Sequence, residues 1–156
     1  MTEPSLAGAS AWEAELYQHL QEHAKSEEHA QSEYRSIADS TPEHDVRFLI
    51  ELILEDEIRH HRLIAQLSDA LRSLVKGAND PPIPWLSPQR PRPELLAATK
   101  EFLAAERDDL KELKRLQKEL RPVEDTTLWA LVVRLLVLDT GKHIEILRFI
   151  EQQAAD

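Results

Sequence analysis

A glutamate and a histidine in the first half of the chain stand at a spacing that can bind a metal ion. Glu57 and His60 are three residues apart in the segment ELILEDEIRHHRLI, residues 51–64. On a helix this separation places a carboxylate and an imidazole on the same face. Helical bundles build two-metal centres from such Glu-x-x-His pairs on two helices and a lone glutamate on each of the other two. The motif therefore predicts a metal centre that further helices must complete.

The second half of the chain repeats this segment with one important change. Residues 134–147, RLLVLDTGKHIEIL, align with residues 51–64, and His143 then corresponds to His60. Thr140 stands where the first copy has its glutamate. A neutral hydroxyl is a poorer ligand for iron than a carboxylate, so the second copy predicts an asymmetric centre.

Two aspartates are candidates to replace the missing carboxylate. Asp139 directly precedes Thr140, and Asp109 lies on the third helical segment. The counterpart of Asp139 in the first copy is Asp56, which accompanies an intact Glu57. This favours the alternative in which Asp56 and Asp139 orient the histidines instead of binding metal.

Length and composition indicate a helical protein with a single domain, residues 1–156. The chain has 156 residues, only three glycines and 42% hydrophobic residues, which is typical of an all-α fold. It has no cysteine, so disulfides, zinc fingers and iron–sulfur clusters are excluded. The net charge of −10 argues against nucleic acid as a partner, because phosphates favour clustered lysine and arginine.

The distribution of apolar residues predicts a protein that works away from membranes. The chain has no apolar run of the ~18–20 residues that a membrane span needs. Its first residues lack the basic and apolar regions of a signal peptide. We therefore expect a soluble, cytoplasmic protein. Its acid-rich surface and long helices permit a homodimer.

Proline and glycine divide the chain into four long helical segments with a crossover between the second and third. Ser10 and Glu13 have capping-box spacing, Pro42 is expected at a first helical position, and Gly77 is expected to end a helix. Residues 77–93 hold six of the nine prolines and predict an extended crossover along the length of a bundle. The predicted helices cover residues 10–38, 42–76, 94–120 and 124–153.

Each predicted helix has an apolar stripe that a titratable residue interrupts near its middle. The stripes include Ile53 and Leu67 on the second helix and Leu136 on the fourth. A titratable group at such a position is costly to bury unless it is paired or coordinated. The interrupting residues, which we expect to converge as metal ligands, are Glu27, Glu57, His60, Glu106 and His143.

Two further histidines lie close to these candidates along the chain. His23 precedes Glu27 by one helical turn, and we interpret it as a hydrogen-bonded core histidine, with a metal contact as the alternative. His61 is rotated by about 100° from His60 around the helix, so we expect it to lie outside the ligand set or at the surface.

Taken together, these motifs resemble those of the ferritin-like superfamily, in particular the di-iron carboxylate proteins of the bacterioferritin and rubrerythrin group. The resemblance covers residues 12–152. Glu27-x-x-Ala30-x-x-x-Tyr34 resembles the first-helix motif, DEIRHH (56–61) the second, and DTGKH (139–143) a degenerate fourth. It implies an antiparallel four-helix bundle with a long proline-rich crossover. In that family the first-helix glutamate is a terminal ligand, the second-helix glutamate bridges two metals, and the tyrosine packs close to them.

The resemblance also implies a function. We expect a metal-binding protein that holds iron, with manganese or zinc as alternatives, and that has ferroxidase or peroxidase activity on O₂ or peroxide. Tyr34 would supply a hydrogen bond or an electron. Because Thr140 departs from the family pattern, two other interpretations remain open. One is a decayed site in a structural or protein-interaction module, and the other is a mononuclear or zinc site with a structural role.

Overall fold

The structure is a computed structural model that describes residues 10–77, 82–84 and 91–155. The described residues form α-helices, one short 3₁₀ turn and irregular connections, which confirms the all-α class. The helical elements are α1 (Ala11–Ser40), α2 (His44–Lys76), α3 (Pro93–Glu119), the 3₁₀ turn η1 (Arg121–Val123) and α4 (Trp129–Ala155).

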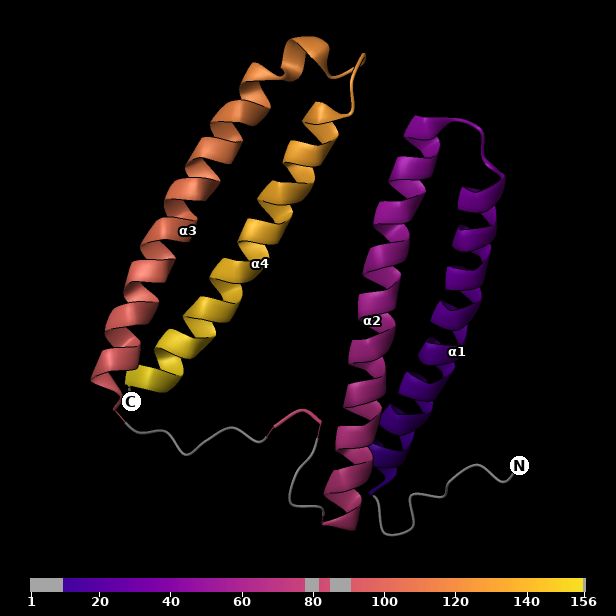
Figure 1. Ribbon diagram of the computed structural model, residues 1–156. Coiled ribbons are helices and arrows are strands. Elements are labelled where there is room, and N and C mark those ends of the chain that lie inside the picture. The colour runs from indigo at the N-terminus through magenta and orange to yellow at the C-terminus, as the bar shows by residue number, and fades with distance from the viewer. Residues whose placement is uncertain (1–9, 78–81, 85–90, 156) are drawn as a thin grey trace. The chain divides into compact units, whose positions relative to one another are not determined.

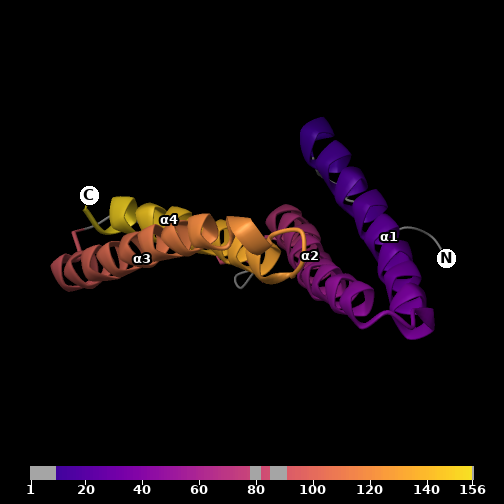
Figure 2. The same cartoon turned by 90° about the horizontal axis from the view of Figure 1, so that it is seen from above.

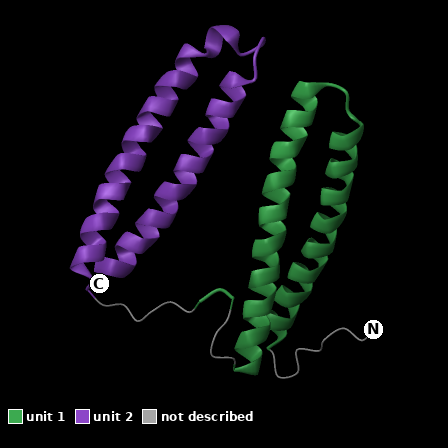
Figure 3. Cartoon of the chain, in the orientation of Figure 1, with its two compact units in different colours: residues 1–86 green, residues 87–156 purple. Residues whose placement is uncertain are grey.

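The helices pair into two hairpins, each within its own compact unit. Residues 1–86 form the first unit, which holds α1 and α2, and residues 87–156 form the second, which holds α3 and α4 (Figures 1 and 3). Within each unit the two helices lie side by side along their length, as the view from above also shows (Figure 2). The single four-helix domain stays a prediction.

Side-chain hydrogen bonds fix the register of the first hairpin. Residues later in α1 pair with residues earlier in α2, so the two helices are antiparallel. The donors and acceptors are Arg72 Nη2 to Tyr17 OH (2.7 Å), Gln21 Nε2 to Ser68 Oγ (2.6 Å) and Gln31 Nε2 to the backbone oxygen of Glu57 (3.1 Å). This register places the middle of α1 opposite the Glu-x-x-His segment of α2.

Apolar packing and a backbone hydrogen bond hold the second hairpin together. Leu103 is 1% exposed, and Val133 and Ile144 are buried with it between α3 and α4. At one end, the backbone N–H of Arg92, just before α3, donates to the carbonyl of Ala154 near the end of α4 (3.0 Å). The two helices are therefore antiparallel too, with the start of α3 beside the end of α4.

The predicted cap and stop of the first hairpin are confirmed. Ser10 and Glu13 form a reciprocal capping box, in which the Ser10 backbone N–H donates to Glu13 Oε2 (2.7 Å) and Ser10 Oγ accepts from the Glu13 N–H (3.3 Å). Gly77 ends α2 in the left-handed region at φ 68°, where glycine carries no Cβ penalty.

Two predicted helix starts are wrong. Pro42 is not the first helical residue, because both its neighbours, Thr41 and Glu43, have extended backbones and α2 begins only at His44. The fourth helix begins at Trp129 and not at Glu124. The threonines between these two positions donate hydrogen bonds from their backbone N–H and hydroxyl groups to one carbonyl oxygen. These bonds form a turn, and the helix starts only after it. The donors are those of Thr126 and Thr127, and the acceptor is Val123 O, at 3.1–3.3 Å.

Part of the predicted crossover, residues 77–93, lies outside the described residues. Residues 78–81 and 85–90 are not described, and Pro82–Pro84 and residues 91–92 are not helical. The third helix begins at Pro93, where the missing N–H costs no helical hydrogen bond.

Along the described helices, no segment combines the length and the apolar character that crossing a membrane requires.

The hairpins bury only part of the predicted stripes. Ile53, Leu67 and Leu136 are 39%, 43% and 45% exposed, whereas Glu27 and Thr140, which lie on these stripes too, are buried. The physical reason is that a helix in a hairpin buries only the face turned toward one neighbour. The remaining apolar side chains stay exposed within each unit.

Candidate metal site

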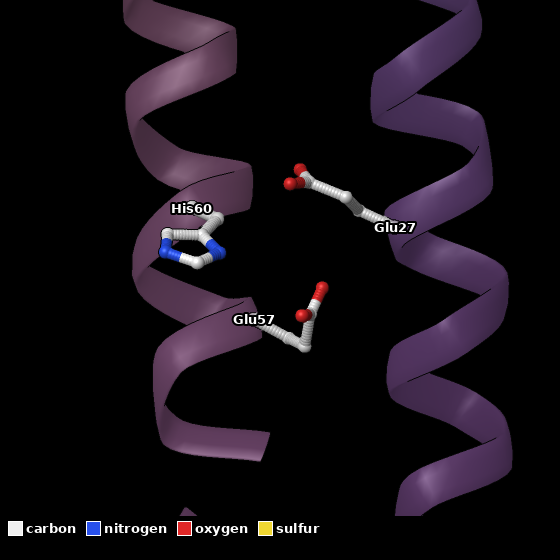
Figure 4. A group of neighbouring side chains, drawn as sticks. All are labelled: Glu27, Glu57 and His60. Atoms are coloured by element: carbon white, nitrogen blue, oxygen red, sulfur yellow. The ribbon is translucent and has the colours of Figure 1, made fainter. Parts of the chain in front are cut away.

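Glu27, Glu57 and His60 lie together between α1 and α2. Each offers one ligand atom, and these three atoms lie within 4.8 Å of one another. Figure 4 shows Glu27 reaching from α1 toward α2, with the Glu57 carboxylate and the His60 imidazole beside it. The Glu-x-x-His pair therefore meets a carboxylate from the neighbouring helix, and three of the five predicted ligands are brought together.

The buried member of this trio is Glu27. Its side chain is 6% exposed, whereas Glu57 is half-buried and His60 is exposed. Glu27 Oε2 is buried without a hydrogen-bond partner among the described residues. Leaving a buried acceptor unsatisfied costs about 1–3 kcal/mol, and more when the group is charged. A cation bound beside Oε2 would satisfy this oxygen.

The donor set suits a first-row divalent cation. Two carboxylates and one imidazole combine oxygen ligands, which manganese and iron accept, with a nitrogen ligand, which favours iron or zinc. Three protein ligands also leave coordination positions for water or a substrate. The residues present therefore fit the metal that the sequence predicted.

Hydrogen bonds from glutamine side chains on either side of the trio join the two helices. The Gln31 side chain, one turn beyond Glu27 on α1, donates to the backbone oxygen of Glu57 on α2 (3.1 Å). On the other side of the trio, Gln21 donates to Ser68, which is 3% exposed. These hydrogen bonds fix the register of α1 against α2, and so the part of α2 that Glu27 meets.

The other two predicted ligands lie together in the second unit. His143 Nδ1 on α4 is 3.4 Å from the carboxylate of Glu106 on α3. Both residues line a groove of about 260 Å³ with Phe102, Ala105 and neighbouring side chains of α4. The predicted ligands thus form two groups, one in each hairpin.

Thr140 and the nearby aspartates occupy different environments. Thr140 is buried in the second hairpin, at 8% exposure. Asp139 accepts from Lys142 (2.6 Å), and its counterpart Asp56 accepts from Arg59 (2.7 Å), so the two copies of the repeat share an ion pair at the same spacing. Asp109 is exposed on α3.

The predicted catalytic residue, Tyr34, lies two helical turns beyond Glu27. It is half-buried on α1, about 10 Å further along the helix axis. Its place in the chemistry stays a prediction.

Two histidines lie near Glu27. His23 is 60% exposed, so the prediction that it is a core histidine is wrong. His23 Nε2 lies 3.3 Å from Glu27 Oε1, and His61 Nδ1 lies 3.9 Å from Glu27 Oε2. The sequence did hold a signal for His61, because it lies four residues after Glu57. Residues four apart share a helix face, just as residues three apart do. The deciding fact is the register of α1 against α2, which the sequence does not specify.

Comparison of the chain with protein-family models, curated proteins and solved structures finds no match among any of them. The likeness to the ferritin-like superfamily therefore rests on the motifs themselves.

Proposed function

We propose that this protein is a ferritin-like metal-binding protein that holds iron and oxidises it with O₂ or peroxide. The observation that carries the proposal is the Glu27 carboxylate, buried with an unsatisfied oxygen in a trio with Glu57 and His60. A divalent cation bound here would satisfy that oxygen and offset the two negative charges. The net charge of −10 also favours cation capture.

We further propose that the two hairpins form one four-helix bundle. Both units leave large apolar side chains exposed that two helices alone cannot cover. They recur at helical spacing with the candidate ligands, since Ile53, His60 and Leu67 are seven residues apart on α2, as are Leu136 and His143 on α4. A bundle would bury these rows and bring Glu106 and His143 to the centre.

In this proposal the side chains of the chain bind and orient the cation. Glu27 and Glu57 supply oxygen ligands, and His60 supplies a nitrogen ligand. Bound ferrous iron would supply electrons to O₂ or peroxide. Tyr34 would donate a hydrogen bond or an electron, and the apolar residues around the centre would limit the access of water.

The test is iron binding followed by oxidation. Full-length protein is loaded anaerobically with Fe(II), desalted and analysed for iron, and then exposed to O₂ while the ultraviolet charge-transfer band of ferric iron is recorded. We expect iron to be retained and to oxidise faster than in buffer. Glu57→Gln should lose most of the bound iron, whereas Glu51→Gln, an exposed position on the same helix, should not.

The experiment tests metal binding and redox activity separately. Iron that is retained but oxidises no faster than in buffer would remove the redox activity and leave metal binding. No retained iron would overturn the proposal and favour a structural or protein-interaction module.

A further inference from the structure

The second hairpin has a cavity that is lined mainly by basic side chains. It has a volume of about 560 Å³ and lies where the end of α3, the turn η1 and the start of α4 meet (Figure 1). The basic residues that line it are Lys114 and Lys118 on α3, Arg121 in η1 and Arg134 on α4. Its other lining residues are Gln117, Glu124 and Ala130. We call it the basic cavity.

The charge of the basic cavity is opposite in sign to that of the whole chain. Four positive side chains and the single negative charge of Glu124 give its lining a net charge of +3, whereas the chain carries −10. All four basic side chains are exposed, so an anion in solution can reach them. The cavity is therefore a local positive site on an acidic protein.

The basic residues of the cavity lack the acidic partners that others in this chain have. Elsewhere among the described residues, a base often pairs with an acid three residues before it, as in Arg59 with Asp56 and Arg148 with Glu145. The residues three places before the four bases of the cavity are Lys111, Arg115, Lys118 and Leu131. None of the four bases forms an ion pair within the described part of the chain. Their charges are therefore available to a ligand.

Helix stability explains only part of this arrangement. Lys118 lies in the last turn of α3, where the helix dipole favours a cation. Arg134 gains nothing from this effect, because it lies near the start of α4, where the dipole favours anions. Lys114 and Lys118 are four residues apart, and like charges at this spacing destabilise a helix. An anion bound in the cavity would offset this repulsion.

The side chains of the basic cavity suit a ligand with several phosphate groups. Arginine binds phosphate oxygens through two parallel N–H bonds, and lysine binds them as a point charge. A single phosphate group carries at most about two negative charges at pH 7, so linked phosphates match a lining of +3 better. The volume of the cavity is typical of small-molecule sites. None of its described lining residues is aromatic, so the cavity offers no surface on which a nucleic-acid base could stack.

We propose that the basic cavity binds a small molecule that carries two or more linked phosphates. Arg121 and Arg134 bind its phosphate oxygens from the turn and from α4, and the two lysines add positive charge from α3. Glu124 weakens the binding, because it places a negative charge beside the ligand. The site lies within the second unit alone and needs neither the metal ion nor the four-helix bundle of the proposed function.

The experiment measures the binding of pyrophosphate and of inorganic phosphate. Metal-free, full-length protein is titrated with each by isothermal titration calorimetry at low salt. We expect one equivalent of pyrophosphate, bound more tightly than phosphate. Arg121→Gln and Arg134→Gln should each weaken pyrophosphate binding by roughly tenfold or more, because each removes hydrogen bonds to a charged group. Arg115→Gln and Arg148→Gln are the matched controls and should bind as the wild type does, because these exposed arginines pair with glutamates on their own helices.

A substitution that strengthens binding guards against misfolding. Glu124→Gln removes the acidic group from the lining while keeping the size of the side chain. It should bind pyrophosphate more tightly than the wild type does, and a misfolded protein would not show this gain. Unchanged or weaker binding by Glu124→Gln would contradict the proposed position of the ligand.

Three other outcomes would overturn the proposal. The first is a wild type that does not bind pyrophosphate, or that binds it no more tightly than phosphate. The second is equal weakening by Arg121→Gln and Arg115→Gln, because binding would then follow net charge and not the cavity. The third is a single-stranded oligonucleotide that binds more tightly than pyrophosphate and loses its affinity in Arg121→Gln, which would assign the cavity to nucleic acid.

Discussion

His143 on α4 lies with its Nδ1 at 3.4 Å from each carboxylate oxygen of Glu106 on α3. The two side chains come from residues 37 apart in the chain, and they are 51% and 27% exposed. Water therefore screens their interaction, and an exposed pair of this kind contributes about 0–1 kcal/mol to stability. The pair therefore does little to hold the hairpin together.

The first prediction follows from that pair. Glu106→Gln and His143→Asn should each change the free energy of unfolding by no more than about 1 kcal/mol, because the pair is screened. Urea denaturation of the metal-free protein measures this. If Glu106 and His143 belong to the iron centre, the same variants should lower the affinity for Fe(II). A loss of several kcal/mol in the metal-free protein would instead assign the pair a structural role.

The second prediction concerns the glutamate that the second repeat lacks. Thr140→Glu would recreate the Glu-x-x-His spacing with His143, at a position that is 8% exposed. Without metal, the buried carboxylate should destabilise the protein by about 2–3 kcal/mol. Saturating Fe(II) should raise the melting temperature of Thr140→Glu by more than it raises that of the wild type, since ligand binding stabilises the folded state.

Thr140→Gln is the control for this substitution. It has the size of glutamate without the charge, so it should show the packing cost and no additional gain from metal. Equal responses of the glutamate and glutamine variants to Fe(II) would show that the fourth-helix position takes no part in the centre.

The helices were predictable because local signals specify them. The capping box of Ser10 and Glu13 and the left-handed Gly77 depend on residues close in the chain, and both are confirmed. The start of α4 was not predictable in the same way. Residues 124–128 have no proline or glycine to break a helix, and the turn arises from competing hydrogen bonds to Val123.

The candidate site was predictable only where it depends on one helix. The spacing of Glu57 and His60 places them on one face in any α-helix, whereas their meeting with Glu27 depends on how α1 and α2 are aligned. That alignment is set by contacts such as Gln31 with the Glu57 carbonyl, which join residues 26 apart. For the same reason the approach of His61 to Glu27 was missed.

The third prediction concerns the core of the second hairpin. Leu103 is 1% exposed on α3, so Leu103→Ala should destabilise the protein by about 2–5 kcal/mol through lost burial and the cavity left behind. Leu116→Ala, on the same helix at 40% exposure, is the matched control and should cost clearly less. Urea denaturation of both variants measures the difference, and equal losses would contradict the packing of α3 on α4.

The last prediction uses the capping box at the start of α1. The hydroxyl of Ser10, and then its backbone N–H, bind the Glu13 carboxylate and lower its pKa below the ordinary value of 4.5. A carboxyl group with a lowered pKa in the folded state stabilises the protein above its unfolded pKa, and this contribution is lost as the pH falls through the folded pKa. Glu13→Gln should therefore melt at a lower temperature than the wild type at pH 7, and the difference should shrink as the pH falls below 4.5.

Two further variants separate the cap from a general effect of charge. Ser10→Ala removes the side chain that both accepts from the Glu13 N–H and donates to its carboxylate, and it should cost about 1 kcal/mol at pH 7. Glu15→Gln is the matched control, because it removes one negative charge from the same helix while the bonds of Ser10 go to Glu13. If Glu13→Gln and Glu15→Gln shifted the melting curve equally at every pH, the shift would come from net charge, and the capping box would not stabilise α1.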